Sequence, residues 1–413
     1  MRRSLLGPPD IPGDPMTRTY AFEGYELDTR RYELRNHGAL VAVEPQVFSV
    51  LAYLAEHADR VVDKEELLDA VWQTRFVTES ALTSRIKDAR RAVGDDGKTQ
   101  RVIRTIHGRG YRFVAEVIAR ESPLVAGDVD PLLDADLGYC RAADGVRIAF
   151  ASTGSGPPLV KAANWLTHLR FDPTNVVWRH WVRDLSRRFR LIRYDERGCG
   201  MSDWDVEDVS FDAWVRDLES VVDHVGVERF PLLGISQGGA VATTYAARHP
   251  DRVSHLVLYG AFPLGRRVRA VNEAERRDAD MLLELLETGW GRDDSMFGSM
   301  LASQFMPEAS PEQWASFVEV QRRTASAHNA KRLMTVSQHI DVTEIAPSVR
   351  VPTLVLHATR DRRVPLEQGQ LFADLIPGAT FVPLESHNHI LLDDEPAWKV
   401  FVEEVERFIS TAG

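Results

Sequence analysis

An apolar run that ends in a glycine-flanked serine constrains this chain more than any other stretch. Residues 230–239 read Phe-Pro-Leu-Leu-Gly-Ile-Ser-Gln-Gly-Gly, so a buried strand passes at once into the small residues that open a helix. Gly234 and Gly238 relieve the crowding around Ser236, whose backbone is strained by so abrupt a turn. The helix points its positive N-terminal end at any negative charge that develops there. We therefore expect Ser236 to be a nucleophile whose hydroxyl projects above the sheet.

A serine nucleophile needs a histidine base and an acid that orients the base. Candidates for the acid and the base follow the serine in that order along the chain. Asp361 lies in the loop after a predicted strand at 353–357. His387 and His389 follow the next predicted strand, at 380–382. The order predicts a Ser-Asp-His arrangement, with either histidine as the base.

Strand and helix patterns alternate through the second part of the chain. The predicted strands cover residues 147–151, 159–163, 190–194, 230–234, 255–259, 353–357 and 380–382. This alternation implies a mostly parallel sheet that is covered by helices on both faces. Residues 262–341 interrupt it with helical patterns alone. We expect this segment to form a cap over the strand ends and its apolar residues to be cap core.

These features resemble the α/β-hydrolase family over almost the whole of residues 137–413. The run from Tyr194 to Ser202, Tyr-Asp-Glu-Arg-Gly-Cys-Gly-Met-Ser, adds to the resemblance. In that family the base lies about seven residues before the Asp/Glu-Pro that opens the last helix, which selects His389 and leaves His387 in reserve. The resemblance implies a serine hydrolase of esterase or lactonase type, in which Arg197 holds its loop.

The oxyanion hole departs from the family pattern. The family places His-Gly after the strand that here ends near residue 163, whereas this chain has Asn164 and Trp165. By position, the backbone N–H groups of Gln237 and Trp165 would stabilise an oxyanion. Either the hole is remodelled around a particular substrate, or catalysis is slow and the pocket mainly binds a ligand. Trp165 and His168 are equally compatible with a substrate-facing and a structural role.

The first hundred residues have a different organisation. Residues 19–43 alternate like short strands, and three helical patterns follow, with Asp63 positioned to cap the second. The third pattern, from about residue 78 to 93, has a buried face and an opposite face of small hydroxyls and cations. The buried residues are Leu82, Ile86, Ala89 and Val93, and the opposite face carries Ser80, Ser84, Lys87 and Arg91, flanked by Arg85. Residues 101–113 read as a hairpin with Arg109 between two glycines at its tip.

Charge is unevenly distributed between the two parts. The net charge of the chain is −11, yet residues 1–120 hold 19 Lys and Arg against 18 Asp and Glu. Between residues 75 and 112 ten basic side chains face four acidic ones. A helix that reads base edges needs short side chains for close approach and cations that reach guanine or phosphate. The basic helix and hairpin therefore predict contact with nucleic acid.

The first part resembles the winged helix-turn-helix of OmpR-type response-regulator effectors. The resemblance rests on the strands, Glu-Pro-Gln at 44–46, the Arg-Arg-Ala-Val-Gly run at 90–94 and the Gly-Arg-Gly-Tyr-Arg-Phe wing. The family inserts its third helix in the major groove and its wing in the minor groove of double-stranded DNA. By position this implies DNA contacts by Ser80, Ser84, Arg85, Lys87, Arg91 and Arg109. Since only about 17 residues come before this part, we expect no receiver domain ahead of it, and the second part is then the candidate sensor.

Composition and motif content argue against a membrane protein, a disulfide-rich secreted protein and a metal- or cofactor-dependent enzyme. The chain has 44% hydrophobic residues but no uninterrupted apolar run of about 18, so we expect no membrane segment. Two cysteines provide no disulfide framework and fit a reducing cytoplasm. The leading residues 1–9 begin like a twin-arginine signal but lack its apolar region, and Met16 is an alternative start. No metal-ligand spacing or glycine-rich phosphate loop occurs, so we expect neither metal nor cofactor.

The sequence therefore predicts two domains. An α+β winged helix-turn-helix covers residues 17–118, a linker covers 119–136, and an α/β-hydrolase fold with a helical cap covers 137–413. The leading hypothesis is a cytoplasmic one-component regulator, as a homodimer, whose second domain senses and can hydrolyse a small ester, lactone or acyl ligand. An active esterase with an accessory first domain is the alternative, and a ligand receptor without catalysis is the third hypothesis.

Overall fold

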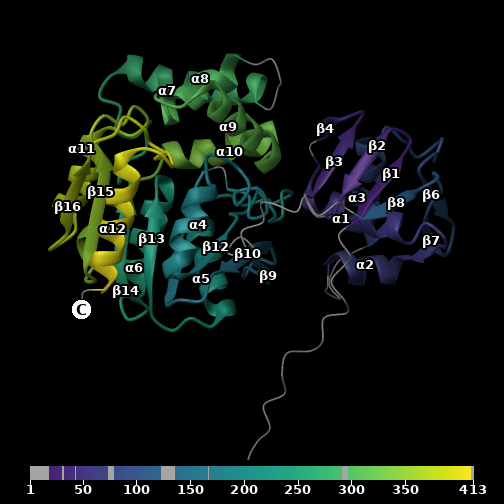
Figure 1. Cartoon of the computed structure of the whole chain (residues 1–413), viewed down its shortest axis with the longest axis horizontal. Coiled ribbons are helices and arrows are strands. Elements are labelled where there is room, and N and C mark those ends of the chain that lie inside the picture. The colour runs from purple at the N-terminus through teal and green to yellow at the C-terminus, as the bar shows by residue number, and fades with distance from the viewer. Residues whose placement is uncertain are drawn as a thin grey trace, which may run out of the picture. The chain divides into compact units, whose positions relative to one another are not determined.

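The chain forms two compact units, Met1–Asp128 and Val129–Gly413. The computed structural model describes residues 18–29, 32–41, 43–72, 79–121, 135–165, 167–290 and 296–410. The leading residues and most of the predicted linker lie outside these ranges. Of the helices within them, none is both long and apolar enough to cross a membrane. The two units are described separately below, with element labels as in Figure 1.

The described residues of the first unit form two antiparallel sheets and three helices. Its five-stranded sheet has the order β4-β3-β2-β1-β8, and its three-stranded sheet the order β5-β7-β6. The strands are β1 (Arg18–Phe22), β2 (Tyr25–Asp28), β3 (Glu33–Asn36), β4 (Ala39–Val41), β5 (Val62–Asp63), β6 (Ile103–Ile106), β7 (Gly110–Phe113) and β8 (Ile118–Glu121). The strand β8 pairs with β1, so residues 119–121, which were predicted to be linker, belong to this sheet.

The helices of the first unit follow the predicted patterns. They are α1 (Pro45–Glu56), α2 (Lys64–Trp72) and α3 (Glu79–Ala92). The carboxylate of Asp63 accepts the backbone N–H of Glu66 at 2.7 Å, so the predicted cap of α2 is confirmed. The predicted inner face of the third helix is also confirmed, since Leu82, Ile86, Ala89 and Val93 are buried in the core of this unit.

The second unit is built on an eight-stranded sheet with the order β16-β15-β14-β13-β11-β12-β10-β9. The strands from β11 to β16 are parallel, and β10 runs antiparallel to both of its neighbours. They are β9 (Asp136–Arg141), β10 (Arg147–Thr153), β11 (Pro158–Lys161), β12 (Arg190–Tyr194), β13 (Phe230–Ile235), β14 (Val253–Tyr259), β15 (Thr353–Ala358) and β16 (Thr380–Leu384). All seven predicted strands are present, and the edge strand β9 was missed.

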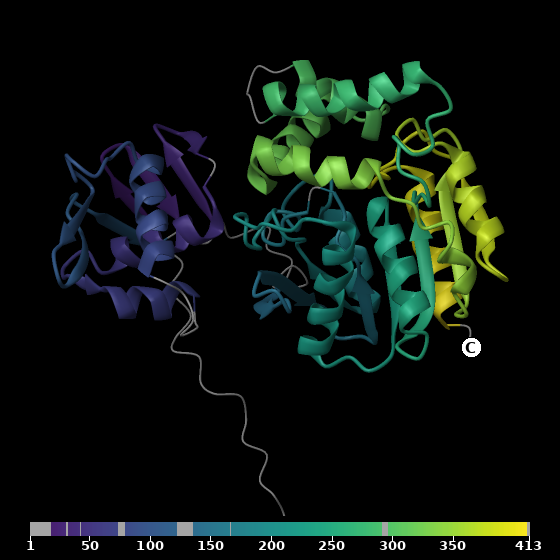
Figure 2. The same cartoon turned by 180° about the vertical axis from the view of Figure 1, so that it is seen from behind.

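Helices cover both faces of this sheet, as the alternation predicted. The helices α4 (Arg179–Arg188) and α12 (Pro396–Ser410) pack together on one face, in front of the sheet in Figure 1. The other face, towards the viewer in Figure 2, carries α5 (Phe211–Val225), α6 (Gln237–Arg248) and α11 (Leu366–Leu375). Their apolar sides and the buried strands form one continuous core.

A group of helices forms the predicted cap. It contains α7 (Glu273–Gly289), α8 (Met296–Phe305), α9 (Pro311–Thr324) and α10 (Ala327–Gln338). They lie together beyond one end of the strands, at the top of Figure 1. A bridge between Leu264 and Asp341 joins the segments that enter and leave the cap. Leu282 and Phe317 are buried there, which confirms that they are cap core, whereas Met281 is exposed and Met334, although buried, also lines the cavity described below.

Candidate functional site

Ser236 occupies the sharp turn between β13 and α6. Its backbone has φ 54° and ψ −127°, a left-handed conformation that costs a non-glycine residue free energy. Glycine is required on both sides of this turn, because a side chain at Gly234 would lie 2.6 Å from the Cα of Gly239 and one at Gly238 would lie 2.4 Å from the carbonyl oxygen of Ala163. The Ser236 N–H donates to the carbonyl of Tyr259 at 3.0 Å, which fixes the turn to β14. The strained elbow predicted from the sequence is therefore present.

Asp361 and His389 form a buried hydrogen-bonded pair. His389 Nδ1 lies 2.6 Å from Asp361 Oδ2. Asp361 Oδ1 accepts the backbone N–H groups of Arg363 at 2.8 Å and Val364 at 2.9 Å. Burial raises the pKa of Asp361, but the charge of His389 and its hydrogen bond lower the pKa further, so the net shift is downward. Asp361 therefore stays ionised and fixes the orientation of the imidazole.

The other ring nitrogen of His389 is available for proton transfer. His389 Nε2 is buried and has no hydrogen-bond partner within the described part of the chain. The backbone N–H of His389 donates to the carbonyl of Phe305 in α8 at 2.7 Å, so the cap holds the loop that carries the imidazole. His387 instead forms an ion pair with Glu308 at 3.0 Å. Of the two histidines predicted as the base, His389 is the one that contacts Asp361.

A small cavity connects Ser236 with the predicted oxyanion-hole residues. Its volume is about 30 Å³, and its wall includes Ser236, Gln237 and Trp165. Trp165 packs edge to face against Trp290 at the end of α7, with ring centroids 5.6 Å apart. This volume holds only one or two water molecules. This volume is far below that of the pockets that usually hold small organic ligands.

Three arginine side chains line the same cavity and were not singled out from the sequence. Arg266 and Arg269 lie in the segment that leads into the cap, and Arg363 lies two residues after Asp361. The remaining wall is formed by Phe262, Phe305, Met334, Ser337, Gln338 and Val364. The only sequence signal was the pair of arginines that directly follows the predicted acid.

Asn164 and His168, on either side of Trp165, are directed into the protein. Asn164 is buried, and its side-chain oxygen accepts a hydrogen bond from the ammonium group of Lys161. His168 is also buried, and its Nδ1 accepts the backbone N–H of Phe171 at 3.2 Å. Burial lowers the pKa of His168 to about 3, so this imidazole is neutral. Trp165 therefore faces the cavity, whereas His168 is structural.

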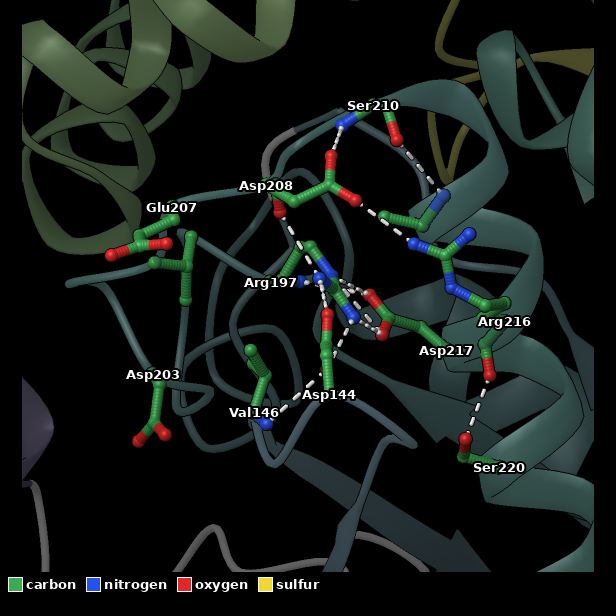
Figure 3. A network of polar contacts seen from close by, with 12 residues as sticks. Asp144, Val146, Arg197, Asp203, Glu207, Asp208, Ser210, Arg216, Asp217 and Ser220 are labelled. Atoms are coloured by element: carbon green, nitrogen blue, oxygen red, sulfur yellow. Dashed lines mark hydrogen bonds and ion pairs between the residues drawn. The ribbon is translucent and has the colours of Figure 1, made fainter.

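Arg197 holds the loop after β12, as predicted. Its guanidinium is completely buried and bonds Asp217 in α5 at 2.6 Å and Asp144 at 2.5 Å (Figure 3). It also donates to the carbonyl of Asp208 at 3.0 Å. Cys199 in the same loop is buried, and burial raises the pKa of its thiol well above the ordinary value. Cys199 is therefore a packing residue and not a nucleophile.

The candidate nucleic-acid interface of the first unit consists of α3 and the β6–β7 hairpin. Ser80, Ser84, Lys87 and Arg91 are exposed on α3, and 77% of the Arg91 side chain is accessible to solvent. Arg85 differs from the prediction. It is buried, and its guanidinium bonds Glu44 at 2.9 Å and Asp88 at 3.2 Å. The helical period placed Arg85 at the edge of the outer face, where the carboxylate of Glu44 draws it towards α1.

The hairpin presents Arg109 at its tip. Arg109 is exposed, and its N–H donates to the carbonyl of Ile106 at 3.0 Å, which closes the turn. Arg90 joins the hairpin to α3, because its guanidinium donates to the carbonyl of Ile103 at 3.0 Å and to the hydroxyl of Thr105 at 2.8 Å. Arg90 therefore connects α3 directly to the first strand of the hairpin.

Comparisons with known proteins agree with both parts of this description. Residues 173–396 match the model of the alpha/beta hydrolase fold, and residues 38–113 match that of the transcriptional regulatory protein, C terminal. The AB hydrolase superfamily protein YisY of Bacillus subtilis is 26% identical over 264 residues, which are 61% of this chain and 91% of that protein. The pyrrolizixenacetamide deacetylase of Xenorhabdus hominickii is 26% identical over 254 residues, 58% of this chain and 87% of that protein.

Solved structures show the same fold in the second unit. The esterase EaEST from Exiguobacterium antarcticum superposes with a TM-score of 0.57 at 23% identity, covering 66% of this chain and 99% of the esterase. The esterase RhEst1 from Rhodococcus sp. ECU1013 superposes with a TM-score of 0.54 at 26% identity, covering 67% of this chain and 99% of that esterase. The chain thus belongs to the α/β-hydrolase fold family and carries, ahead of that domain, an OmpR-type DNA-binding regulator domain.

Proposed function

We propose that this protein is a one-component transcription regulator whose second unit binds and hydrolyses a small ester, lactone or acyl ligand. The observation that carries the proposal is the arrangement of His389, which is bonded to Asp361 through Nδ1 and leaves Nε2 without a partner among the described residues. The name of the deacetylase relative, which denotes removal of an acyl group, agrees with this class of reaction. The regulator domain at residues 38–113 supports DNA as the partner of the first unit.

In the proposed mechanism, Ser236 Oγ attacks the carbonyl carbon of the ligand. His389 Nε2 accepts the hydroxyl proton and later returns it to the leaving group, while ionised Asp361 orients the imidazole and stabilises its charged form. The backbone N–H groups of Gln237 and Trp165 stabilise the tetrahedral oxyanion, and loss of one such donor costs about 3 kcal/mol. The positive end of α6 adds to this stabilisation.

In the first unit, the exposed side of α3 enters the major groove and Arg109 of the wing contacts the minor groove or phosphate. The small side chains of Ser80 and Ser84 permit close approach, and Lys87 and Arg91 reach base edges or phosphates. Domains of this kind act in pairs on DNA, so we propose a homodimer that acts in the cytoplasm. Ligand in the second unit changes how the two first units are presented to DNA.

Covalent labelling tests the nucleophile. A fluorophosphonate should label the wild-type protein and a Ser254→Ala control, in which the serine lies at the opposite end of β14 from the cavity. Ser236→Ala should be unlabelled, and its hydrolysis of p-nitrophenyl acetate should fall by about three orders of magnitude or more. Labelling of Ser236→Ala at the wild-type rate would contradict the assignment. Folded wild-type protein that is neither labelled nor active would favour a receptor without catalysis.

A salt-titrated DNA-binding assay tests the regulator function. Arg91→Ala and Arg109→Ala should each weaken binding about tenfold and lower the dependence of log affinity on log salt by about one, because each change removes one cation at the phosphates. Arg35→Ala is the matched control, since this arginine lies on β3 and pairs with Glu33 at 2.8 Å. If both interface variants bind as the control does, the active esterase with an accessory domain is the better description.

A further inference from the structure

The cavity beside Ser236 has a strongly positive wall. Arg266, Arg269 and Arg363 line it together, and no acidic residue is among the described residues that line it. An ester-binding pocket is mostly apolar with a few polar groups, and three guanidiniums exceed what a neutral acyl chain requires. Their positions therefore indicate a charged ligand.

These three side chains lack the partners that a structural arginine has. Within the described residues, none of them forms an ion pair with a carboxylate. Arg269 donates to the carbonyl of Leu264 at 3.1 Å, and Arg363 donates to the sulfur of Met334 at 3.3 Å. Neither contact neutralises the positive charge. All three side chains are only partly exposed, and an arginine that is largely withdrawn from water is normally paired, because an unpaired charge loses its hydration.

Aromatic rings hold two of the guanidiniums in position. Arg269 lies 5.8 Å from the ring centroid of Phe262, and Arg363 lies 5.0 Å from that of Phe305. Such stacking leaves the edge of the planar guanidinium, with its N–H donors, available to a ligand. The side chains are thus fixed without their donors being occupied by a carboxylate.

The pKa values of two of the cavity arginines agree with a positive charge that lacks a counter-ion. Burial, Arg266 and Arg269 lower the pKa of Arg363 to about 9, and burial together with Arg266 lowers the pKa of Arg269 to about 10. Asp361 opposes both shifts and Glu275 also opposes that of Arg269, but the Asp361 carboxylate is bonded to His389 and to two backbone N–H groups, and that of Glu275 to Asn272 and to the N–H of Val271. A ligand anion would supply the counter-charge that the described residues do not.

We propose that the ligand of this site is an acidic acyl compound, whose carboxylate is held by Arg266, Arg269 and Arg363 while its scissile carbonyl lies at Ser236. The proposal rests on the function proposed above and specifies its substrate class. The planar guanidinium matches a carboxylate with two parallel N–H···O bonds, which are stronger than bonds between neutral groups. The anion would join the segment leading into the cap to the loop that carries Asp361.

A matched pair of esters tests this assignment. Mono-p-nitrophenyl succinate and p-nitrophenyl butyrate share a leaving group and a four-carbon acyl chain, but only the first ends in a carboxylate. Wild-type protein should have a kcat/KM at least about tenfold higher for the succinate. Arg269→Gln and Arg363→Gln should each lower the succinate-to-butyrate ratio of kcat/KM about tenfold or more, because each loses one charge-assisted contact.

Two neighbouring arginines provide control variants. Arg267 is paired with Asp280 at 3.0 Å, and Arg362 is exposed, and neither lines the cavity. Arg267→Gln and Arg362→Gln should keep the wild-type ratio. A wild-type ratio near one, or equal losses in the control and cavity variants, would overturn the assignment. Circular dichroism of every variant checks that the fold is retained.

A binding measurement separates this inference from the proposed hydrolysis. Glutarate should bind to Ser236→Ala in a calorimetric titration, and the added change Arg363→Gln should weaken that binding at least about tenfold. If wild-type protein hydrolyses neither ester but glutarate binds in this way, the hydrolase function fails and the carboxylate site stands. If butyrate is hydrolysed, succinate is not preferred and glutarate does not bind, the hydrolase function stands and the carboxylate site is wrong.

Discussion

Two arginines of the second unit, Arg197 and Arg363, differ in how their positive charges are balanced. Arg197 is completely enclosed, but two carboxylates, Asp144 and Asp217, contact its guanidinium within 2.6 Å (Figure 3). Arg363 is partly exposed at the wall of the Ser236 cavity, and none of the described residues pairs its charge with a carboxylate. The first arrangement satisfies the charge within the fold, whereas the second leaves it for a ligand.

The first unit shows the same division. Arg85 is bonded to Glu44, and Arg90 is bonded to the hairpin, so both hold the unit together. Arg109 extends from the wing into solvent. We therefore expect arginines that the fold pairs and buries to be structural, and exposed or unpaired ones such as Arg109 and Arg363 to serve in binding; Arg91, which is exposed but bonds Asp88 at 2.7 Å, combines features of both. This rule predicts opposite stability effects for Arg197 and Arg363.

The largest expected effect is that of Arg197→Met. Removing one partner from a buried ion pair leaves an uncompensated charge, which costs about 3 to 5 kcal/mol of the free energy of unfolding. Urea denaturation followed by tryptophan fluorescence measures it, because eight of the nine tryptophans lie in the second unit. Arg216→Met is the control. Arg216 also lies in α5 but pairs with Asp208 at the surface, so it should cost less than about 1 kcal/mol.

The loss caused by Arg197→Met should grow with pH. Burial already raises the pKa of Asp217 to about 6 against the opposing effect of Arg197, and the variant removes that opposition. A buried acid whose folded pKa is raised contributes stability in its protonated form, which is lost as pH rises through that pKa. The deficit relative to wild type should therefore be larger at pH 8 than at pH 5. An equal deficit at both values would show that Asp217 is solvated.

Local motifs carried enough information to predict much of the candidate site. The glycines around Ser236 indicate a sharp turn, because a larger side chain at these positions would collide with the backbone. The number of residues between the histidine and Pro396 selected His389, which contacts Asp361. The inner face of α3 followed from the helical period. These features depend on residues close together in sequence, so patterns of a few residues describe them.

Features that depend on distant partners could not be predicted in this way. The carboxylate that pairs with Arg85 lies 41 residues away, and the helical period alone placed that arginine at the edge of an exposed face. The edge strand β9 contains Asp136 and Gly138, whose residue types do not favour a strand, and it is stabilised by pairing with β10. The three cavity arginines come together only when the segment leading into the cap meets the loop after β15.

The smallest expected effect is that of Arg363→Gln on the free energy of unfolding. We expect this change to stabilise the protein, whereas Arg197→Met should destabilise it. Removing one of three neighbouring positive charges should raise the free energy of unfolding by about 0.5 to 1 kcal/mol, since binding sites hold groups that the folded state alone does not favour. Arg362→Gln should change it by less than about 0.5 kcal/mol, as expected for an exposed position. Glutarate at about 100 times its Kd should raise the free energy of unfolding of the wild-type protein by about 2.7 kcal/mol and that of the variant by much less. The wild-type protein should then be the more stable of the two. A loss of 2 kcal/mol in the variant without glutarate would instead place Arg363 with Arg197, as a structural residue.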